Sequence, residues 1–300
     1  MKTLIRYAGG KSKAIDKITP YVKDYDTIVS PFIGGGSLEV HWSTEHGKRV
    51  IGYDIFDVLV NFWQQLLGNP NDLADKMSEI NPTSAEYSRI KEILISSTNT
   101  QEMLKDWSTD HYKRPSPTTL EPLVLAAYYY FNHNCSYGPG YLGWGSSVYL
   151  TKDKWDAMIR KVREFKAPLL EVYNKTFDQS IIDHPTDFLY LDPPYYLEKD
   201  SDNKMHKGMY PMKNIDVHHT GFNHELLRDL LLKHEGDFVM SYNNCETIRE
   251  YYKDFEFFFP EWSYSMSNGE KRIGKNRIEL NQGEIVKKSH EILIVKRKKD

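Results

Sequence analysis

The sequence predicts an α/β domain with a mostly parallel sheet and, inserted into it, a second domain that is mainly helical. Short apolar segments rich in β-branched and aromatic residues alternate with amphipathic helical segments, which is typical of a doubly wound sheet. Between residues 69 and 165 this alternation stops, and only helical and turn patterns are found. We therefore predict that residues 1–68 and 166–300 form the sheet domain and that residues 69–165 form the inserted domain.

Several of the expected strands are apolar almost throughout, as strands covered on both faces of a parallel sheet are. The parallel strands are expected at residues 27–32, 49–54, 169–174, 187–192 and 237–242, and a terminal hairpin pair at residues 255–260 and 291–296. The helices are expected at residues 36–46, 222–236 and 245–254 in the sheet domain and at residues 84–96, 122–134 and 153–165 in the insertion.

The composition argues against several classes of protein. A net charge of −3 excludes a uniformly basic nucleic-acid coat, although residues 266–300 hold ten Lys and Arg against five Asp and Glu. Two cysteines are too few for a disulfide framework or a cysteine-based zinc site, and no metal is expected. No apolar run approaches the roughly 18 residues that span a membrane, and the first residues lack a hydrophobic signal region. We expect a soluble, intracellular (cytoplasmic) protein with no membrane contact.

The segment Gly9-Gly10-Lys11-Ser12 looks like the end of a phosphate-binding loop. Such a loop needs another glycine five positions before Gly10, because a long run of backbone N–H groups must surround the phosphates. The chain has Ile5 there. A nucleoside triphosphatase is therefore disfavoured, and the segment needs another explanation.

A second glycine cluster, residues 31–37, follows an expected strand and opens an expected helix. Glycines there let the backbone approach a ligand closely, and the helix N-terminus favours a negative group. Asp54 ends the next strand, where a carboxylate can accept hydrogen bonds from ribose hydroxyls. The three glycines are consecutive and do not fit the dinucleotide spacing. The pattern indicates a nucleoside ligand, and a simple tight turn is the alternative.

The third motif is Asp192-Pro193-Pro194-Tyr195 at the end of another apolar strand. The two prolines fix the backbone and remove two N–H donors. What remains is a carboxylate and a carbonyl oxygen side by side, next to an aromatic face. This arrangement suits the amino group of a planar ring, whereas the alternative is a turn with exposed tyrosines.

Together, the three motifs resemble those of the Dam-type (D12 class) DNA adenine-N6 methyltransferases, which use S-adenosylmethionine. Residues 7–11 resemble the family's aromatic-Ala-Gly-Gly-Lys motif, residues 31–37 its Pro-Phe-x-Gly-x-Gly-Ser cofactor loop, and residues 192–195 its catalytic motif. The motifs occur in the family's order, with the insertion before the catalytic motif. The resemblance implies a Rossmann-like methyltransferase sheet whose inserted helical domain, residues 69–165, recognises the DNA target.

The resemblance also implies roles for individual residues. Lys11 is expected to face the methionine carboxylate and not a phosphate, and Phe177 to pack on the adenine of S-adenosylmethionine, which becomes S-adenosylhomocysteine. The catalytic residues are expected to be Asp192, Pro193, Pro194 and Tyr195. The cofactor-binding residues are expected to be Tyr7, Ala8, Gly9, Gly10, Lys11, Pro31, Phe32, Gly34, Gly36, Ser37, Asp54, Ile55, Phe177 and Asp192.

The chemistry of adenine explains why these residue types suit the reaction. The amino nitrogen is a poor nucleophile, because its lone pair is delocalised into the ring. Asp192 and the Pro193 carbonyl can accept its two N–H bonds and free the lone pair, which needs alignment and charge placement. The base must be flipped out of the duplex, with Tyr195 as a stacking surface. Neither cysteine follows a proline, so methylation of a cytosine carbon through a cysteine adduct is disfavoured.

Double-stranded DNA is the expected partner, and two segments are candidates to contact it. The loop at residues 131–145 holds no Arg or Lys, so Asn132, His133 and Asn134 are the candidate base contacts. Helix capping and turn formation are their alternative roles. Residues 267–288 are expected to grip DNA phosphates, with a solvated hairpin tip as the alternative; the residues proposed there are Arg272, Lys275 and Arg277.

Two other functions remain open at this point. One is an amino-group methyltransferase that acts on ribosomal RNA adenine or on cytosine N4, and the other is a catalytically silent binding protein. The Asp-Pro-Pro-Tyr motif favours adenine, the large insertion favours duplex DNA, and intact Asp192 and Tyr195 argue against a silent protein. A restriction–modification system with a cognate endonuclease is a further possible context.

Overall fold

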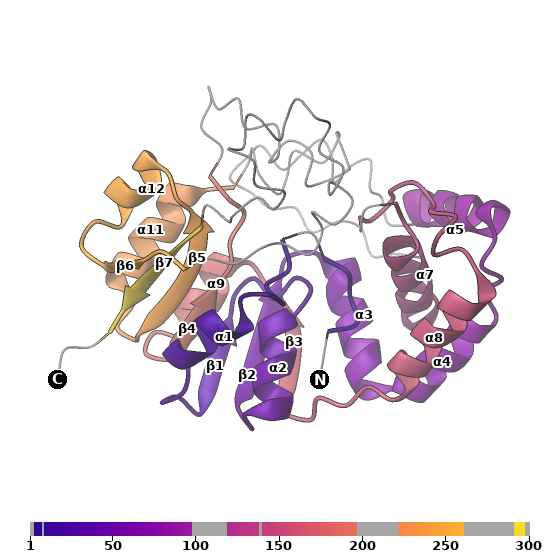
Figure 1. Ribbon diagram of the computed structural model, residues 1–300, viewed down its shortest axis with the longest axis horizontal. Helices are drawn as coiled ribbons and strands as arrows, with labels where there is room; N and C mark the ends of the chain where they lie inside the picture. The colour runs from indigo at the N-terminus through magenta and orange to yellow at the C-terminus, as the bar shows by residue number, and fades with distance from the viewer. Residues whose placement is uncertain are drawn as a thin grey trace, which may run out of the picture.

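The computed structural model describes residues 3–7, 9–97, 119–137, 140–196, 222–260 and 291–297. Within these residues, seven strands form one sheet in the order β3-β2-β1-β4-β5-β7-β6 (Figure 1). The strands are β1 Thr27–Ser30, β2 Arg49–Asp54, β3 Leu170–Asn174, β4 Phe188–Leu191, β5 Phe238–Asn243, β6 Glu256–Phe258 and β7 Glu291–Lys296. Every strand predicted from the sequence is present, with its ends shifted by a few residues at most.

The first five strands of this order run parallel, as predicted. The predicted terminal pair is also confirmed, because β6 and β7 pair antiparallel. The sequence did not predict that β7 would also pair antiparallel with β5, with Glu291 opposite Asn243. Because β7 runs against the other strands, its first residue lies at the edge where the parallel strands have their carboxyl ends.

Helices cover both faces of the sheet, so the domain has three layers. Alternate residues of each strand point to opposite faces: Ile28 packs into one hydrophobic cluster with α1, α2 and α3, while Val29 packs into the other with α9, α11 and α12. The helices are α1 Ile15–Ile18 with the 3-10 turn η1 Thr19–Tyr21, α2 Ser37–Glu45, α3 Asp57–Gly68, α9 Phe177–Asp183, α11 His224–Lys233 and α12 Glu246–Tyr251. The strands are therefore buried on both sides, which explains their nearly continuous apolar sequences.

The predicted insertion is helical wherever the structure describes it. Its helices, α4 Pro70–Ser78, α5 Ser84–Ser97, α7 Pro122–Asn134 and α8 Lys152–Arg163, gather beyond α3 on one side of the molecule (Figure 1). Trp155 of α8 is buried and donates its indole N–H to the Met77 carbonyl at 3.1 Å. One hydrophobic cluster continues from these helices through Trp63 and Leu66 of α3 to the sheet. The boundaries at residues 69 and 165 therefore stay a prediction.

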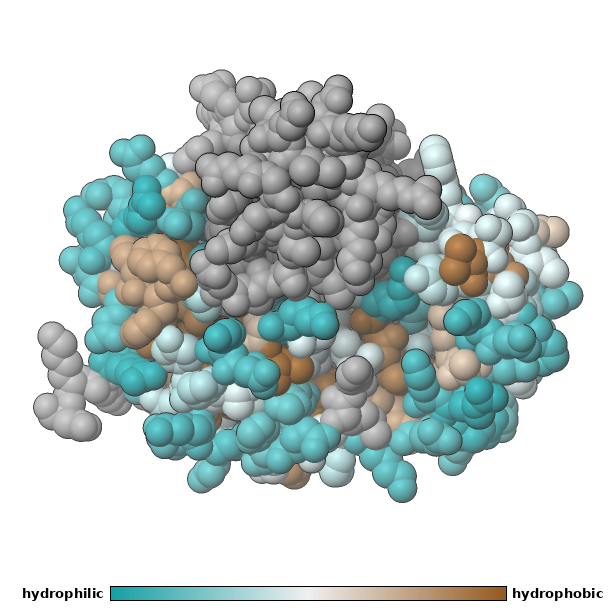
Figure 2. All heavy atoms as spheres, in the orientation of Figure 1, coloured by the Kyte–Doolittle hydropathy of each residue, from teal (hydrophilic) through white to brown (hydrophobic). Residues whose placement is uncertain are grey.

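In one view of the surface, hydrophilic side chains dominate, and hydrophobic colour gathers beside β6 (Figure 2). Phe258, which ends β6, and the adjacent Phe259 are 37% and 58% exposed. Among the helices that the structure describes, none is long and apolar enough to cross a membrane. Among the Asp, Glu, Lys and Arg residues that the structure describes, Lys11, Glu39 and Glu291 are buried.

Candidate active site

The three sequence motifs meet at one place in the sheet. β1 and β4 are neighbours, but the chain continues from β1 to β2 on one side and from β4 to β5 on the other. In open α/β sheets, ligands bind outside the carboxyl ends of the strands at such a switch point. The glycine loop (residues 31–37) follows β1, and the Asp192–Tyr195 motif follows β4. The tertiary structure thus gives both motifs a common location.

The glycine loop is held in a backbone conformation that side chains disfavour. Gly34 and Gly36 have φ angles of +46° and +61°, in the left-handed region. A Cβ atom on Gly36 would lie 2.7 Å from the Trp63 ring, and one on Gly35 would lie 2.5 Å from the Tyr7 Cβ. Tyr7 therefore packs directly on the loop. Conformation favours glycine at position 34, space requires it at position 35, and both apply at Gly36, so the first and second sequence motifs form one unit.

Asp54 fixes the glycine loop from the end of β2. Its Oδ2 accepts the Gly34 backbone N–H at 3.0 Å, and its Oδ1 accepts the Phe56 N–H at 2.9 Å. Burial raises the pKa of this carboxyl to about 6, although the backbone N–H bonds favour the charged form. Each oxygen has a further lone pair. The carboxylate can hold the loop and still accept a hydrogen bond from a ligand hydroxyl.

The other expected cofactor residues lie around this loop. Phe32 and Phe177 stack with their ring centroids 5.6 Å apart, and Phe177 begins α9 just after β3. The Ile55 carbonyl accepts a hydrogen bond from Asn174 at 3.0 Å. Pro31 and Ser37 are buried, and Gly10 donates its N–H to the Tyr7 carbonyl at 3.1 Å, whereas Ala8 lies outside the described residues. Their contact with a cofactor stays a prediction.

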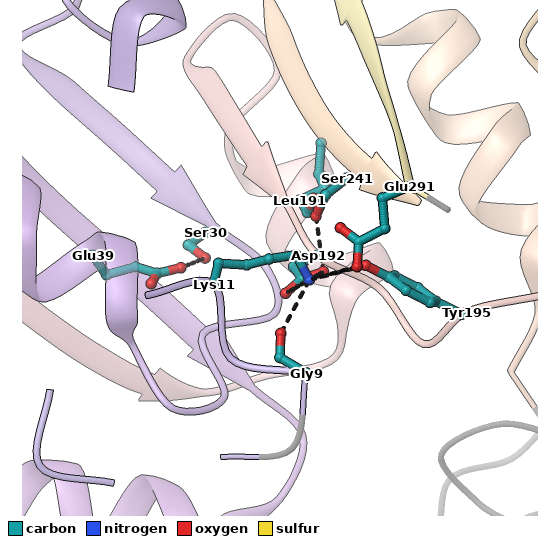
Figure 3. Close-up of polar contacts among 9 residues, drawn as sticks. All are labelled: Gly9, Lys11, Ser30, Glu39, Leu191, Asp192, Tyr195, Ser241 and Glu291. Carbon is teal, nitrogen blue, oxygen red and sulfur yellow. Dashed lines mark hydrogen bonds and ion pairs between the residues drawn. The ribbon is translucent and has the colours of Figure 1, made fainter. Parts of the chain in front are cut away.

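Lys11 binds the Asp192 carboxylate, a contact that the sequence did not predict (Figure 3). Its Nζ donates to the two Asp192 carboxylate oxygens at 2.7 and 2.9 Å, to the Tyr195 hydroxyl at 2.9 Å and to the Gly9 carbonyl at 3.2 Å. Burial alone lowers the pKa of Lys11, but the charges of Asp192 and Glu291 outweigh burial and raise the pKa above its ordinary value. The ammonium therefore stays charged although only 4% of its side chain is exposed.

Two residues of β5 hold the motif after β4. Ser241 donates its hydroxyl to Asp192 Oδ1 at 2.8 Å. Asn243 accepts the Tyr196 N–H and donates to the Tyr196 carbonyl, both at 2.9 Å. Tyr195 is only 8% exposed and packs against Tyr242, so its role as a stacking surface for a base stays a prediction. Neither β5 residue was singled out from the sequence.

Glu291 is a further charged residue of the site that sequence reasoning missed. It begins β7, its side chain is 3% exposed, and its Oε1 lies 3.8 Å from the Lys11 Nζ. We call Lys11, Asp192, Tyr195 and Glu291 the ionic cluster. The available signal was an acidic residue at the start of an apolar strand, and it becomes informative only when that strand is known to be antiparallel.

The predicted base contacts of α7 are inside the protein. Asn134 accepts the Arg6 backbone N–H at 3.0 Å, and Asn132 accepts the Leu142 N–H at 2.6 Å. The His133 Nε2 lies 3.2 Å from the Arg6 carbonyl oxygen, and burial lowers the pKa of His133 to about 3. All three side chains are buried. The structure favours the alternative, structural role: His133 and Asn134 fasten the end of α7 to the segment that carries Tyr7 and Lys11, and Asn132 holds the loop at Leu142.

The remaining predicted DNA contacts, Arg272, Lys275 and Arg277, lie outside the described residues and stay predictions. Across the described ranges, no group of three or more His, Cys, Asp or Glu is arranged to hold a metal ion.

Comparison with known proteins supports the interpretation of the motifs. Modification methylase StsI of Streptococcus sanguinis is 24% identical over 304 residues, covering 98% of this chain and 42% of the relative. Type II methyltransferase M.FokI of Planomicrobium okeanokoites is 24% identical over 292 residues, covering 92% of this chain and 42% of the relative. The chain spans less than half the length of these curated relatives.

The sequence model of one family matches residues 7–266, a range that contains all three motifs and most of the chain. This confirms the resemblance found in the sequence. The chain belongs to the D12 class of N6 adenine-specific DNA methyltransferases.

Proposed function

We propose that this protein transfers a methyl group from S-adenosylmethionine to the N6 amino group of adenine at a specific sequence in duplex DNA. The observation that carries this proposal is the position of Asp192. Its carboxylate follows β4 at the switch point of the sheet, where Lys11 and Ser241 bind it, and Pro193 is the next residue. Membership of the D12 class supports adenine in DNA over RNA or cytosine N4.

The residues around the glycine loop fit the proposed cofactor. Asp54 has lone pairs for the ribose hydroxyls, and the left-handed glycines leave the backbone open to close approach. Phe177 offers an aromatic face beside the same loop for the adenine ring. When bound, S-adenosylmethionine supplies a methyl group on a positively charged sulfur.

The residues after β4 then act on the substrate adenine. Asp192 and the Pro193 carbonyl accept the two amino hydrogens, which makes the nitrogen lone pair available for attack. Lys11 already binds both Asp192 oxygens, but each oxygen can accept more than one hydrogen bond. Asp192 can therefore accept an amino hydrogen while Lys11 stays in place. Tyr195 is proposed to stack on the base once it has left the duplex.

We further propose that the helices of residues 69–165 recognise the target sequence and that the basic segment around Arg272, Lys275 and Arg277 binds phosphates. Because the two curated relatives are named as a modification methylase and a type II methyltransferase, we propose a restriction–modification context with an endonuclease of the same specificity.

Sequencing of DNA from cells tests the function directly. The chain is expressed in a bacterial host that lacks adenine methylation, and the genomic DNA is sequenced with detection of modified bases. We expect N6-methyladenine at one short sequence motif, and none in cells that express Asp192→Ala at an equal level. Methylated RNA, N4-methylcytosine, or no methylation at all would contradict the proposal.

A further inference from the structure

Glu291 is a buried acid in the same cluster as the Lys11 ammonium, and the proposed mechanism does not yet use it. Its Oε1 lies 3.8 Å from the Lys11 Nζ, and the Tyr195 hydroxyl lies beside the same carboxylate. Figure 3 shows its carboxylate pointing toward Lys11 and the Tyr195 hydroxyl. Burying a charge is costly unless it is paired and hydrogen-bonded. A carboxylate in this position needs an explanation beyond stability.

The proposed reaction creates a need that such a group can meet. When the adenine nitrogen gains a methyl group, it carries two hydrogens and a positive charge, so one proton must leave. Asp192 is the nearest acceptor to the amino group, but it is also bound to Lys11 and Ser241. If the proton stayed on Asp192, it would weaken the ion pair that positions this residue.

We propose that Glu291 is a positioning residue that keeps Lys11 charged and, through Lys11, takes up the proton released from the adenine amino group. This inference rests on the proposed function. The proton has a short path, because the Lys11 Nζ lies 2.7 Å from an Asp192 oxygen and 3.8 Å from the Glu291 Oε1. The second distance is just beyond hydrogen-bond length.

The transfer balances within the chain. As the N6–CH3 bond forms, the bond between the methyl group and the sulfonium sulfur breaks and leaves a neutral thioether. One N6–H bond also breaks, and its proton moves to an Asp192 oxygen. The Lys11 Nζ gives a proton to the Glu291 Oε1 and receives the proton from Asp192 in its place. Asp192 and Lys11 end as they began, and the net change is one new O–H bond on Glu291. The positive charge that arrived with the methyl group ends as this proton, and nothing is oxidised or reduced.

The charges around Glu291 suit this role. Burial raises the pKa of Glu291 to about 7. The positive charge of Lys11 lowers this pKa, and the negative charge of Asp192 raises it. A group with this pKa can both release and hold a proton near neutrality, as efficient proton transfer requires. The neighbouring Tyr195 hydroxyl and the opposite residue on β5, Asn243, bring no charge of their own.

Glu39 provides a matched control in the same protein. It is also buried, burial also raises its pKa to about 7, and its Oε1 accepts the Ser30 hydroxyl at 2.7 Å. It makes no recorded ion pair with Lys11 among the described residues. A general effect of a buried glutamate should therefore appear in both residues, and a role in proton uptake only in Glu291.

The first test measures the single-turnover rate of methyl transfer against pH, with unmethylated genomic DNA of the expression host and radiolabelled S-adenosylmethionine. In the wild type and in Glu39→Gln, the rate should fall as the pH drops below about 7, where Glu291 becomes protonated. In Glu291→Gln this fall in rate at low pH (the acid limb of the profile) should disappear. The rate itself should be about 10²-fold lower, which is the scale of positioned proton transfer. Compared with Glu291→Gln, Glu291→Asp should recover part of the rate and part of the fall in rate at low pH. An unchanged limb in Glu291→Gln, or its loss in Glu39→Gln, would overturn the inference.

The second test needs no DNA or cofactor. The titration of glutamate carboxyls is followed by carbon NMR in the folded wild type and in Lys11→Met, with Glu291→Gln used to assign the signal. Removal of the ammonium should move the Glu291 titration to higher pH and leave that of Glu39 unchanged; no movement would show that Lys11 and Glu291 are not coupled.

If the wild type methylates no DNA, the proposed function fails and the proton path with it. If it does and Glu291→Gln keeps the acid limb, only this inference fails.

Discussion

The glycine loop and the ionic cluster lie at the same edge of the sheet, one after β1 and the other after β4, yet different forces hold them. Left-handed glycines, ring packing and backbone hydrogen bonds shape the loop. Charged and polar side chains from distant segments form the cluster. The loop should therefore respond mainly to changes of shape, and the cluster mainly to changes of charge and pH.

Two aspartates make the same contrast. Asp54 and Asp192 each follow a buried parallel strand, but Asp54 accepts backbone N–H groups, whereas Asp192 accepts a lysine ammonium and a serine hydroxyl. Neutral backbone donors fix a carboxylate to a structure, while an ion pair fixes it to another side chain. This contrast agrees with the proposed roles of Asp54 in binding and Asp192 in chemistry.

The largest effect is expected in the ionic cluster. Asp192→Ala should lower methyl transfer by at least about 10²–10³-fold, because an electrostatic contact aimed at the reacting group is lost. The circular dichroism spectrum and urea unfolding should show that the fold persists. Robust turnover by this variant would remove the contrast between the two aspartates and the proposed mechanism with it.

In the glycine loop, shape should dominate. Gly36→Ala combines a left-handed conformation with a collision against Trp63 and should lower the free energy of unfolding by about 3 kcal/mol. Gly47 has the same φ of +61° but nothing within 4 Å of its Cβ position, so Gly47→Ala should cost only about 1 kcal/mol. Urea unfolding of both variants measures the difference. Equal losses would mean that the loop is not closely packed.

The proposed role of the glycine loop in binding S-adenosylmethionine is tested with Asp54→Ala. Loss of a hydrogen bond to a charged group should weaken S-adenosylmethionine binding by roughly 1.5–3 kcal/mol per bond. Asp57→Ala is the matched control, since Asp57 lies nearby and accepts the Val58 N–H at the start of α3. Calorimetry should show a large effect for Asp54 and a small one for Asp57. Unchanged affinity in Asp54→Ala would rule out the ribose contact.

A pH effect on stability is expected from Glu39, which bonds Ser30 and no cation among the described residues. Its pKa is raised by burial to about 7, so the folded state holds this proton more tightly than the unfolded state. That contribution is complete below the unfolded pKa and is lost as the pH rises through about 7. Between pH 5 and pH 8 the wild type should lose about 2 kcal/mol more than Glu39→Gln does. Urea unfolding at both pH values checks this, and parallel losses would contradict it.

The smallest effect is expected for the Tyr195 hydroxyl, which accepts a hydrogen bond from Lys11 at 2.9 Å. Tyr195→Phe keeps the ring and removes this bond, so turnover should fall by the equivalent of about 0.5–1.5 kcal/mol. Tyr195→Ala also removes the ring and should cost a further 1–3 kcal/mol or so if the base stacks there. Equal turnover by the two variants would argue against stacking, and the kinetic constants of each are the measurement.

The sequence alone was sufficient to locate the strands, the three motifs and six helices, but it did not predict α1, α3, α4 or α9. Strand and helix patterns are local, because they depend on which face of a few successive residues is apolar. The role of Asn132, His133 and Asn134 was predicted less well, since their position in a polar loop sequence does not show that Arg6 and Leu142 cover and bind them.

What only the tertiary structure decided is which distant side chains meet. Lys11 and Asp192 are 181 positions apart, and their contact requires the N-terminal segment to cross the end of β4. Glu291 reaches the same place because β7 pairs antiparallel with β5. Its first residue therefore lies at the edge where the parallel strands have their carboxyl ends. Local propensity fixes neither the order nor the direction of strands. The order and direction of the strands depend on how the whole chain buries both faces of the sheet. The residues that meet in the ionic cluster therefore cannot be read from any single segment of the sequence.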